Sequence, residues 1–71
     1  MEWHRIAGNW QHFKVLARVR WARISGDDFD LIAGRRQVLA SQIQVAYRVS
    51  PEMALRQLEA WQGQQREPEG R

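Results

Sequence analysis

The hydrophobic residues of this chain recur at helical intervals, and the first such stretch follows a short polar break. At about 100° per residue, its apolar side chains gather within an arc of about 80°. These side chains are Trp10, Phe13, Ala17, Trp21 and Ile24. The pattern predicts an amphipathic helix from about Trp10 to Arg23 whose apolar stripe faces the core.

A second helical region is expected after Ser25, and its large apolar residues share one face if the helix is continuous. They are Phe29, Ile32, Leu39, Ile43 and Tyr47. Gly34 interrupts this region, and a glycine inside a helix costs about 1 kcal/mol relative to alanine. Either Gly34 breaks or kinks the helix, or it permits close backbone packing. A break or kink is favoured, because Arg36 would otherwise lie inside the apolar stripe.

The last predicted helix runs from about Pro51 to Gln62, with Ala54, Leu58 and Trp61 facing inward. Gly63 suits a C-terminal cap. Residues 64–71 contain no hydrophobic side chain and are expected to be disordered. We therefore predict one helical domain over residues 1–63 and a disordered tail over 64–71.

Three polar residues stand where helices are expected to begin, and each can cap a helix through its side-chain oxygen. They are Asn9, Ser25 and Ser50, the last followed by a proline suited to a first helical turn. No strand is indicated, because the sequence has no sustained alternation of apolar and polar residues and no Asn-Gly or Asp-Gly turn. The sequence therefore predicts an all-α fold, a small bundle of three to four helices.

The composition indicates that side-chain packing, without disulfides, must stabilise this fold. The chain has 71 residues, no cysteine and four tryptophans. Disulfides and thiolate metal sites are thus excluded. Each buried indole removes up to about 200 Å² from water, so four of them can anchor a small core.

The charge is unevenly distributed along the chain. Eleven basic residues, all arginine except Lys14, stand against eight acidic ones, and no acid lies between Trp3 and Gly26. Once the helices pack, one basic face can form from Lys14, Arg18, Arg20, Arg23, Arg35, Arg36 and Arg48. Such a face either binds nucleic acid or is an ordinary solvated helix surface. Arg36, beside the core stripe, either pairs with Asp27, Asp28 or Glu59 or extends its head group to water.

No group of residues specifies a reaction. The two histidines, His4 and His12, are eight residues apart, whereas a helical zinc pair needs a spacing of four and a third ligand. Asp27, Asp28 and Asp30 are explained by the positive end of a helix dipole. We therefore predict no catalytic, cofactor-binding or metal-binding residues, and a protein that is not an enzyme.

Hydropathy favours a cytoplasmic location. The longest apolar runs are three residues, such as 15–17, far shorter than a membrane span. The first five residues carry charge and lack the apolar segment of a secretory signal.

Taken together, the spacing of aromatic, glycine and acidic residues resembles the CsbD-like family of small bacterial proteins. The resemblance rests on Trp3, Ile6, Gly8, Asn9, Trp10, Phe13, Lys14, Trp21, Asp27, Asp28, Ile32, Gly34, Arg36, Leu39, Ile43, Gln44, Tyr47, Ala54 and Trp61. It covers the chain from about Trp3 to Trp61 without gaps. It implies a SAM-domain-like pair of crossed α-hairpins and an association with the general stress response. It implies no enzymatic activity, cofactor or catalytic residue.

The chain departs from the family pattern where the family usually carries glycine or polar residues. Those positions hold Val15, Leu16, Val19, Val38 and Val45. On the first predicted helix, Val15 and Val19 lie roughly opposite the tryptophan stripe, and Val38 and Val45 are expected on a similar outward flank of the second helical region. Two interpretations stay open: an unexceptional surface, or a patch for a homodimer or for a partner helix. The polar rim of that patch would come from Arg18, Arg23 and Arg35.

Overall fold

The computed structural model describes residues 1–68, and in that range it contains five α-helices and no β-strand. The helices are α1 (Trp3–Gly8), α2 (Trp10–Arg20), α3 (Gly26–Ile32), α4 (Arg36–Tyr47) and α5 (Pro51–Gln64). The predicted all-α class is confirmed. The predicted number of three to four helices was too low, because the short helix before Asn9 was not foreseen.

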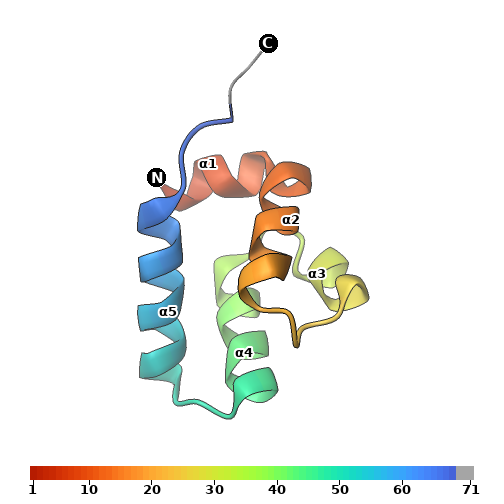
Figure 1. The fold of residues 1–71 in the computed structure, drawn as a ribbon, viewed down its shortest axis with the longest axis vertical. Coiled ribbons are helices and arrows are strands. Elements are labelled where there is room, and N and C mark those ends of the chain that lie inside the picture. The colour runs from red at the N-terminus through yellow and green to blue at the C-terminus, as the bar shows by residue number, and fades with distance from the viewer. Residues whose placement is uncertain (69–71) are drawn as a thin grey trace.

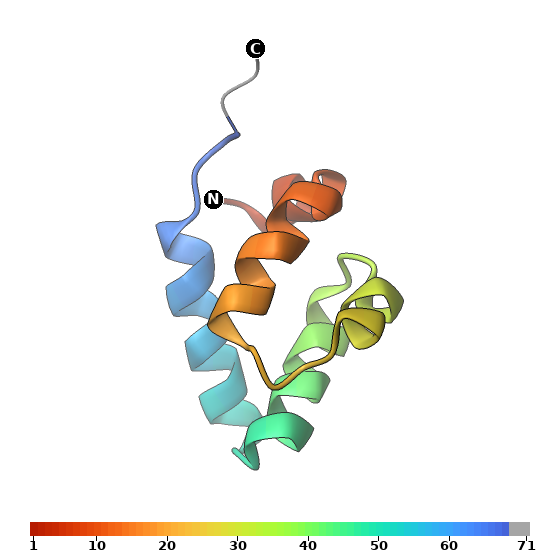
Figure 2. The ribbon, with the colours of Figure 1, turned by 45° about the vertical axis from the view of Figure 1, so that its right-hand side comes forward.

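Helices α4 and α5 stand side by side as an antiparallel hairpin (Figures 1 and 2). Helix α1 runs across the end of this hairpin at which α5 finishes (Figure 1). Helix α2 contacts α1 at one end and α3 along its flank, and α3 in turn contacts α4. Helix α2 buries Trp10, Phe13 and Ala17 on one side and leaves its other side exposed.

The boundary between α1 and α2 differs from the prediction. The side chain of Asn9 makes no capping bond to α2; its Nδ2 donates instead to the Arg5 carbonyl at 3.4 Å. Its backbone N–H donates to the Ile6 carbonyl at 3.1 Å. Asn9 therefore donates hydrogen bonds to carbonyls at the end of α1, and these carbonyls lack partners within the helix. The predicted cap was wrong because the preceding helix was not foreseen.

Helix α2 also ends earlier than Arg23. Trp21 leaves helical geometry at φ −121° and ψ 68°, and its N–H donates to the Ala17 carbonyl at 2.8 Å. The chain then turns, with the Ile24 N–H donating to the Trp21 carbonyl. This turn lets Ile24 enter the core before α3 begins, which a continuous helix would not achieve.

Two predicted caps are confirmed. The Ser25 hydroxyl accepts from the Asp28 N–H, and the Ser50 hydroxyl accepts from the Met53 N–H, each at 3.1 Å. Pro51 occupies the first turn of α5. These short side chains fix where α3 and α5 begin, as their sequence context indicates.

The break at Gly34 is confirmed, and the glycine also permits close packing. Ala33 and Gly34 both have positive φ, 50° and 79°, so α3 stops at Ile32. A Cβ on Gly34 would lie 3.2 Å from the Cα of Ala7 in α1. The Gly34 carbonyl accepts a hydrogen bond from Trp3 Nε1 at 2.8 Å. The same glycine therefore separates α3 from α4 and allows α1 to pack closely against the turn between them.

The end of α5 lies beyond its predicted position. The helix continues through Gly63 to Gln64 and stops at Gln65, whose Nε2 donates to the Trp61 carbonyl at 2.9 Å. Gly63 is therefore not the cap. In the segment predicted to be disordered, Gln64 is helical and the Glu67 carboxylate accepts from Arg5, which raises the pKa of that guanidinium. Residues 69–71 lie outside the described residues.

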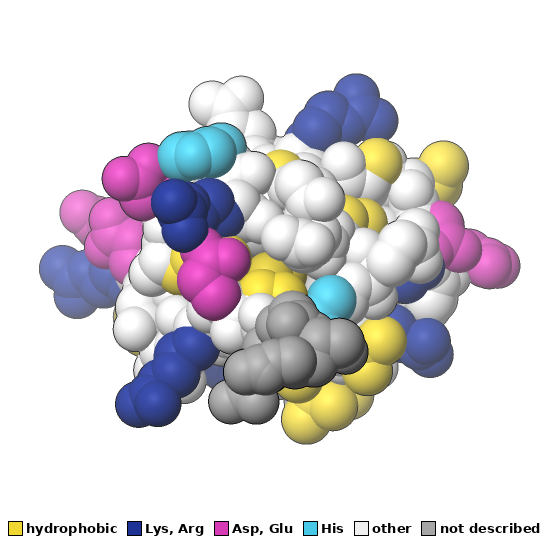
Figure 3. Space-filling model, turned by 90° about the horizontal axis from the view of Figure 1, so that it is seen from above, with side chains coloured by type: hydrophobic (Ala, Val, Ile, Leu, Met, Phe, Trp, Pro, Cys, Tyr) yellow, Lys and Arg dark blue, Asp and Glu magenta, His cyan; other side chains and the backbone are white. Residues whose placement is uncertain are grey.

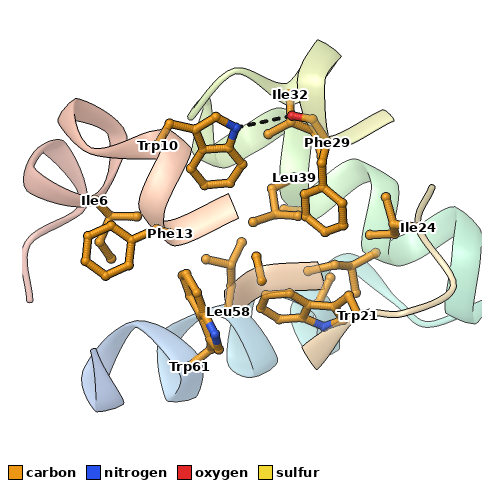
Figure 4. Packing of buried hydrophobic residues seen from close by; sticks show 14 residues of the cluster. Ile6, Trp10, Phe13, Trp21, Ile24, Phe29, Ile32, Leu39, Leu58 and Trp61 are labelled. Carbon is orange, nitrogen blue, oxygen red and sulfur yellow. Dashed lines mark hydrogen bonds between the residues drawn. The ribbon is translucent and has the colours of Figure 1, made fainter. Parts of the chain in front are cut away.

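The core is a single cluster of hydrophobic side chains drawn from all five helices (Figure 4). It contains every predicted core residue except Trp3 and Tyr47, which are partly buried and pack against it, and it adds Ile6 and Ala40. The centroid of the Trp61 ring lies 5.5 Å from that of Trp21 and 6.2 Å from that of Trp3. Aromatic rings thus connect α1, the end of α2 and α5.

We predict that Trp21→Ala unfolds the domain or costs about 3–5 kcal/mol of stability. Trp21 is fully buried, and its Nε1 donates to Gln57 at 3.1 Å, so truncation leaves a cavity and an unpaired amide. Urea denaturation followed by circular dichroism measures the loss. Val19→Ala, a truncation of an exposed neighbour, is the control and should melt like the parent. Parent-like melting of Trp21→Ala would refute the core assignment.

Two glycine substitutions should act in opposite directions. Gly34→Ala is expected to destabilise by more than about 1 kcal/mol, because it adds a Cβ at positive φ against the α1 backbone. Gly63→Ala is expected to stabilise by up to about 1 kcal/mol, because Gly63 lies inside α5 with open space around it. Thermal melts of both variants test this. Destabilisation by Gly63→Ala would argue that α5 ends there.

Candidate interaction surface

The outer side of α2 carries a row of apolar side chains in water. Val15 is 59 % exposed, Leu16 39 % and Val19 79 %. The same helix buries Trp10, and its C-cap residue Trp21 is buried as well, so the row occupies the side turned away from the core. The prediction that Val15 and Val19 lie outside the core is confirmed. We call Val15, Leu16 and Val19 the α2 row.

An open hollow of about 420 Å³ adjoins this row. It is lined by Val15, Arg18, Val19, Ala22, Ile24, Ser25 and Gly26. The chain between α2 and α3 folds back here, which places buried Ile24 and the start of α3 against the row. Sequence analysis missed the contribution of Ile24, Ser25 and Gly26, because periodicity within one helix does not report where a turn folds back.

Arginines flank the row on both sides. At about 100° per residue, Arg18 and Arg20 project to opposite sides of the line through Val15 and Val19. Arg18 extends over the hollow, since its Cζ would lie 3.2 Å from a Cβ on Gly26. The guanidinium of Arg20 stacks over the Trp21 ring, 5.2 Å from its centroid. Both head groups therefore occupy defined positions beside the row.

The valines of α4 do not extend the row as predicted. Val38 is partly buried and packs against the core, so its predicted outward position was wrong. Val45 is 78 % exposed, yet it belongs to α4 and does not line the hollow.

Two members of the predicted basic face are engaged within the fold. Lys14 Nζ lies 2.7 Å from a carboxylate oxygen of Asp30, and its side chain is only 18 % exposed. Arg36 is half-buried, and its Nε donates to Gln62 Oε1 at 3.3 Å. The predicted carboxylate partners of Arg36 are absent among its contacts in residues 1–68; an amide takes their place.

The other members of the predicted basic face are exposed but spread over several elements. Arg23 stacks over the Tyr47 ring at 5.5 Å, Arg35 donates to the Leu31 carbonyl, and Arg48 caps α4 with φ 54°. Arg18 and Arg20 flank the α2 row. Seen from the end at which α1 lies, basic and acidic side chains sit next to one another around the molecule (Figure 3).

The histidines and acidic residues do not gather into a metal site in the described part of the chain. Within residues 1–68, no group of three or more His, Cys, Asp or Glu side chains is placed to hold a metal ion. His4 lies 3.2 Å from Glu2, and His12 meets the edge of the Phe13 ring. In the same part of the chain, no helix is both long and apolar enough to cross a membrane.

Comparison with known proteins places the chain among small bacterial relatives. It is 33 % identical over 61 residues to a UPF0337 protein of Rhodopseudomonas palustris, covering 86 % of this chain and 92 % of the relative. It is 32 % identical to one of Agrobacterium fabrum, over 92 % of this chain and 97 % of that protein. It is 31 % identical to the UPF0337 protein YjbJ of Escherichia coli, over 78 % and 80 %.

The chain belongs to the UPF0337, or CsbD-like, family. The resemblance read from its residues is thereby confirmed. No family model and no solved structure matches the chain. The names of these CsbD-like relatives assign no reaction and no ligand, so the chemistry of the α2 surface must be argued from its own residues.

In this CsbD-like protein, the Lys14–Asp30 pair connects the α2 flank to α3, and we predict a modest role for it. Asp30→Asn should cost about 0.5–1 kcal/mol, because Lys14 is largely covered and loses its charged partner. The loss should shrink at high salt, which screens the pair in the parent. Urea titrations at low and high salt measure it, with Glu59→Gln, at an exposed acid of α5 outside the first helical turn, as the control. Equal effects of both substitutions would count against the pair.

Proposed function

We propose that this CsbD-like chain is a non-enzymatic bacterial protein of the general stress response that acts by binding a macromolecular partner. Support for the binding role comes from one observation: the α2 row is exposed on a helix whose opposite side is buried in the core. Contiguous exposed apolar surface beside a groove or hollow is a feature of interaction sites. Support for the stress role comes from family membership alone.

The stress role is tested by expression and by loss of the gene. Levels of the protein should rise in starved and salt-stressed cells relative to growing cells, measured by quantitative immunoblotting. A deletion strain should survive those stresses less well, and the parent sequence supplied on a plasmid should restore survival. Flat levels and unchanged survival across all conditions would refute the stress role, whatever the chain binds.

Nucleic-acid binding is the second candidate, and the exposure of Arg18, Arg20 and Arg23 favours it. Those head groups lie near one another in sequence on a stretch without acids. If they contact phosphates, affinity for DNA should fall steeply between about 50 and 200 mM salt as counterions are released. A fluorescence titration with duplex and single-stranded DNA checks this. Absence of binding at the lower salt would remove the candidate.

Two further properties stay predictions. A cytoplasmic location is expected, and fractionation of cells followed by immunoblotting tests it. The SAM-domain-like crossing of two hairpins is implied by the resemblance, and superposition of an experimental structure on SAM domains tests it. Neither property is required for binding through α2.

A further inference from the structure

We propose that the α2 row and the adjoining hollow form a docking site for an acidic amphipathic helix of another protein. The inference rests on the proposed binding role and names the chemistry of the partner. Three features of the surface carry it: an apolar row along about one turn of α2, a concave hollow beside it, and arginines on both flanks. A helix that presents its own apolar row between carboxylates complements all three.

The shape and lining of the hollow indicate which apolar side chains the partner helix presents. Its floor includes Ile24, which is 4 % exposed, and its walls include Val15 and Val19. A leucine or phenylalanine on the partner can enter it, while neighbouring apolar residues one turn away cover Leu16. Arg18 stands at the edge of the hollow, over Gly26, where it meets a carboxylate on the partner's flank.

Charge disfavours a second copy of this chain packed with α2 against α2. No acidic residue lies between Trp3 and Gly26, and the acids that follow, Asp27 and Asp28, lie in the first turn of α3. If two α2 rows faced each other, Arg18 and Arg20 of both copies would converge with no carboxylate from either α2 to pair them. The row also comprises only three side chains, whereas a stable interface buries about 800 Å² on each partner. A short helix with opposite charge fits this size and charge better.

Shape and side-chain type decide against nucleic acid and lipid at this site. Phosphates gain nothing from valines at the centre of the surface, and the arginines lie at its margins. Helices that lie in a bilayer interface typically insert Trp, Phe or Leu, whereas the most exposed positions here are Val15 and Val19. A concave hollow receives a single side chain from a helix, whereas a lipid surface is flat.

The test uses two designed peptides of about 16 residues, long enough to form a helix. One carries leucines at positions i, i+3, i+4 and i+7 flanked by glutamates, and the other has lysine in place of each glutamate. Binding of fluorescein-labelled peptide to the full chain is measured by anisotropy. We expect the glutamate peptide to bind at least about tenfold more tightly than the lysine peptide, and its affinity to fall with salt.

Matched variants locate the site. Val19→Glu should weaken binding of the glutamate peptide about tenfold, because a buried apolar contact is lost and a like charge is added. Val45→Glu introduces the same charge at an equally exposed valine of α4, 78 % against 79 %, and should leave binding unchanged. Arg18→Gln should weaken binding about threefold to fivefold. Circular dichroism melts should show all three variants folded, because each substituted side chain is exposed.

Several results would overturn the proposal. They are equal binding of both peptides, absence of binding, and equal effects of Val19→Glu and Val45→Glu. Binding of duplex DNA or of vesicles with anionic lipid that Val19→Glu abolishes would assign the surface to those ligands instead. Sedimentation showing a dimer that Val19→Glu dissociates would assign it to a second copy. None of these results bears on expression under stress, so the stress role stands or fails separately.

Discussion

The fold depends on packing four indole rings together while the N–H groups of three of them are hydrogen-bonded. Three of the four tryptophans donate across elements: Trp3 to the Gly34 carbonyl, Trp10 to the Phe29 carbonyl and Trp21 to the Gln57 amide. Each bond ties a large apolar surface to one orientation, because a buried indole N–H without an acceptor is costly. Helix α1, the α3 region and α5 are positioned by these three bonds around the ring of Trp61.

The same constraint produces the exposed surface. Trp10 and Trp21, at the two ends of α2, both turn inward, which fixes the rotation of that helix about its axis. Val15 and Val19 must then face outward, and no rearrangement of α2 can bury them without exposing an indole. An apolar row in water is thus a direct consequence of the core. The arginines beside the row make the surface partly basic, so that it favours a partner with negative charge.

Gly34 and the turn after α2 show how local backbone geometry shapes the candidate site. The positive φ of Ala33 and Gly34 reverses the chain between α3 and α4, and α1 packs against that turn. The turn at Trp21 to Ile24 brings the start of α3 back along α2, with Gly26 against Arg18 and Asp30 against Lys14. The hollow exists because of this return, and Lys14 is withdrawn from the basic face by it.

The sequence by itself determined the helical class, the two serine caps, the break at Gly34 and nearly all of the core, because periodicity and caps are local properties of the chain. It also indicated that Val15 and Val19 face away from the core. It did not determine that Asn9 closes a preceding helix, that Val38 packs inward, or that Arg36 meets an amide. Those outcomes depend on which elements lie next to one another, and only the tertiary structure decided that.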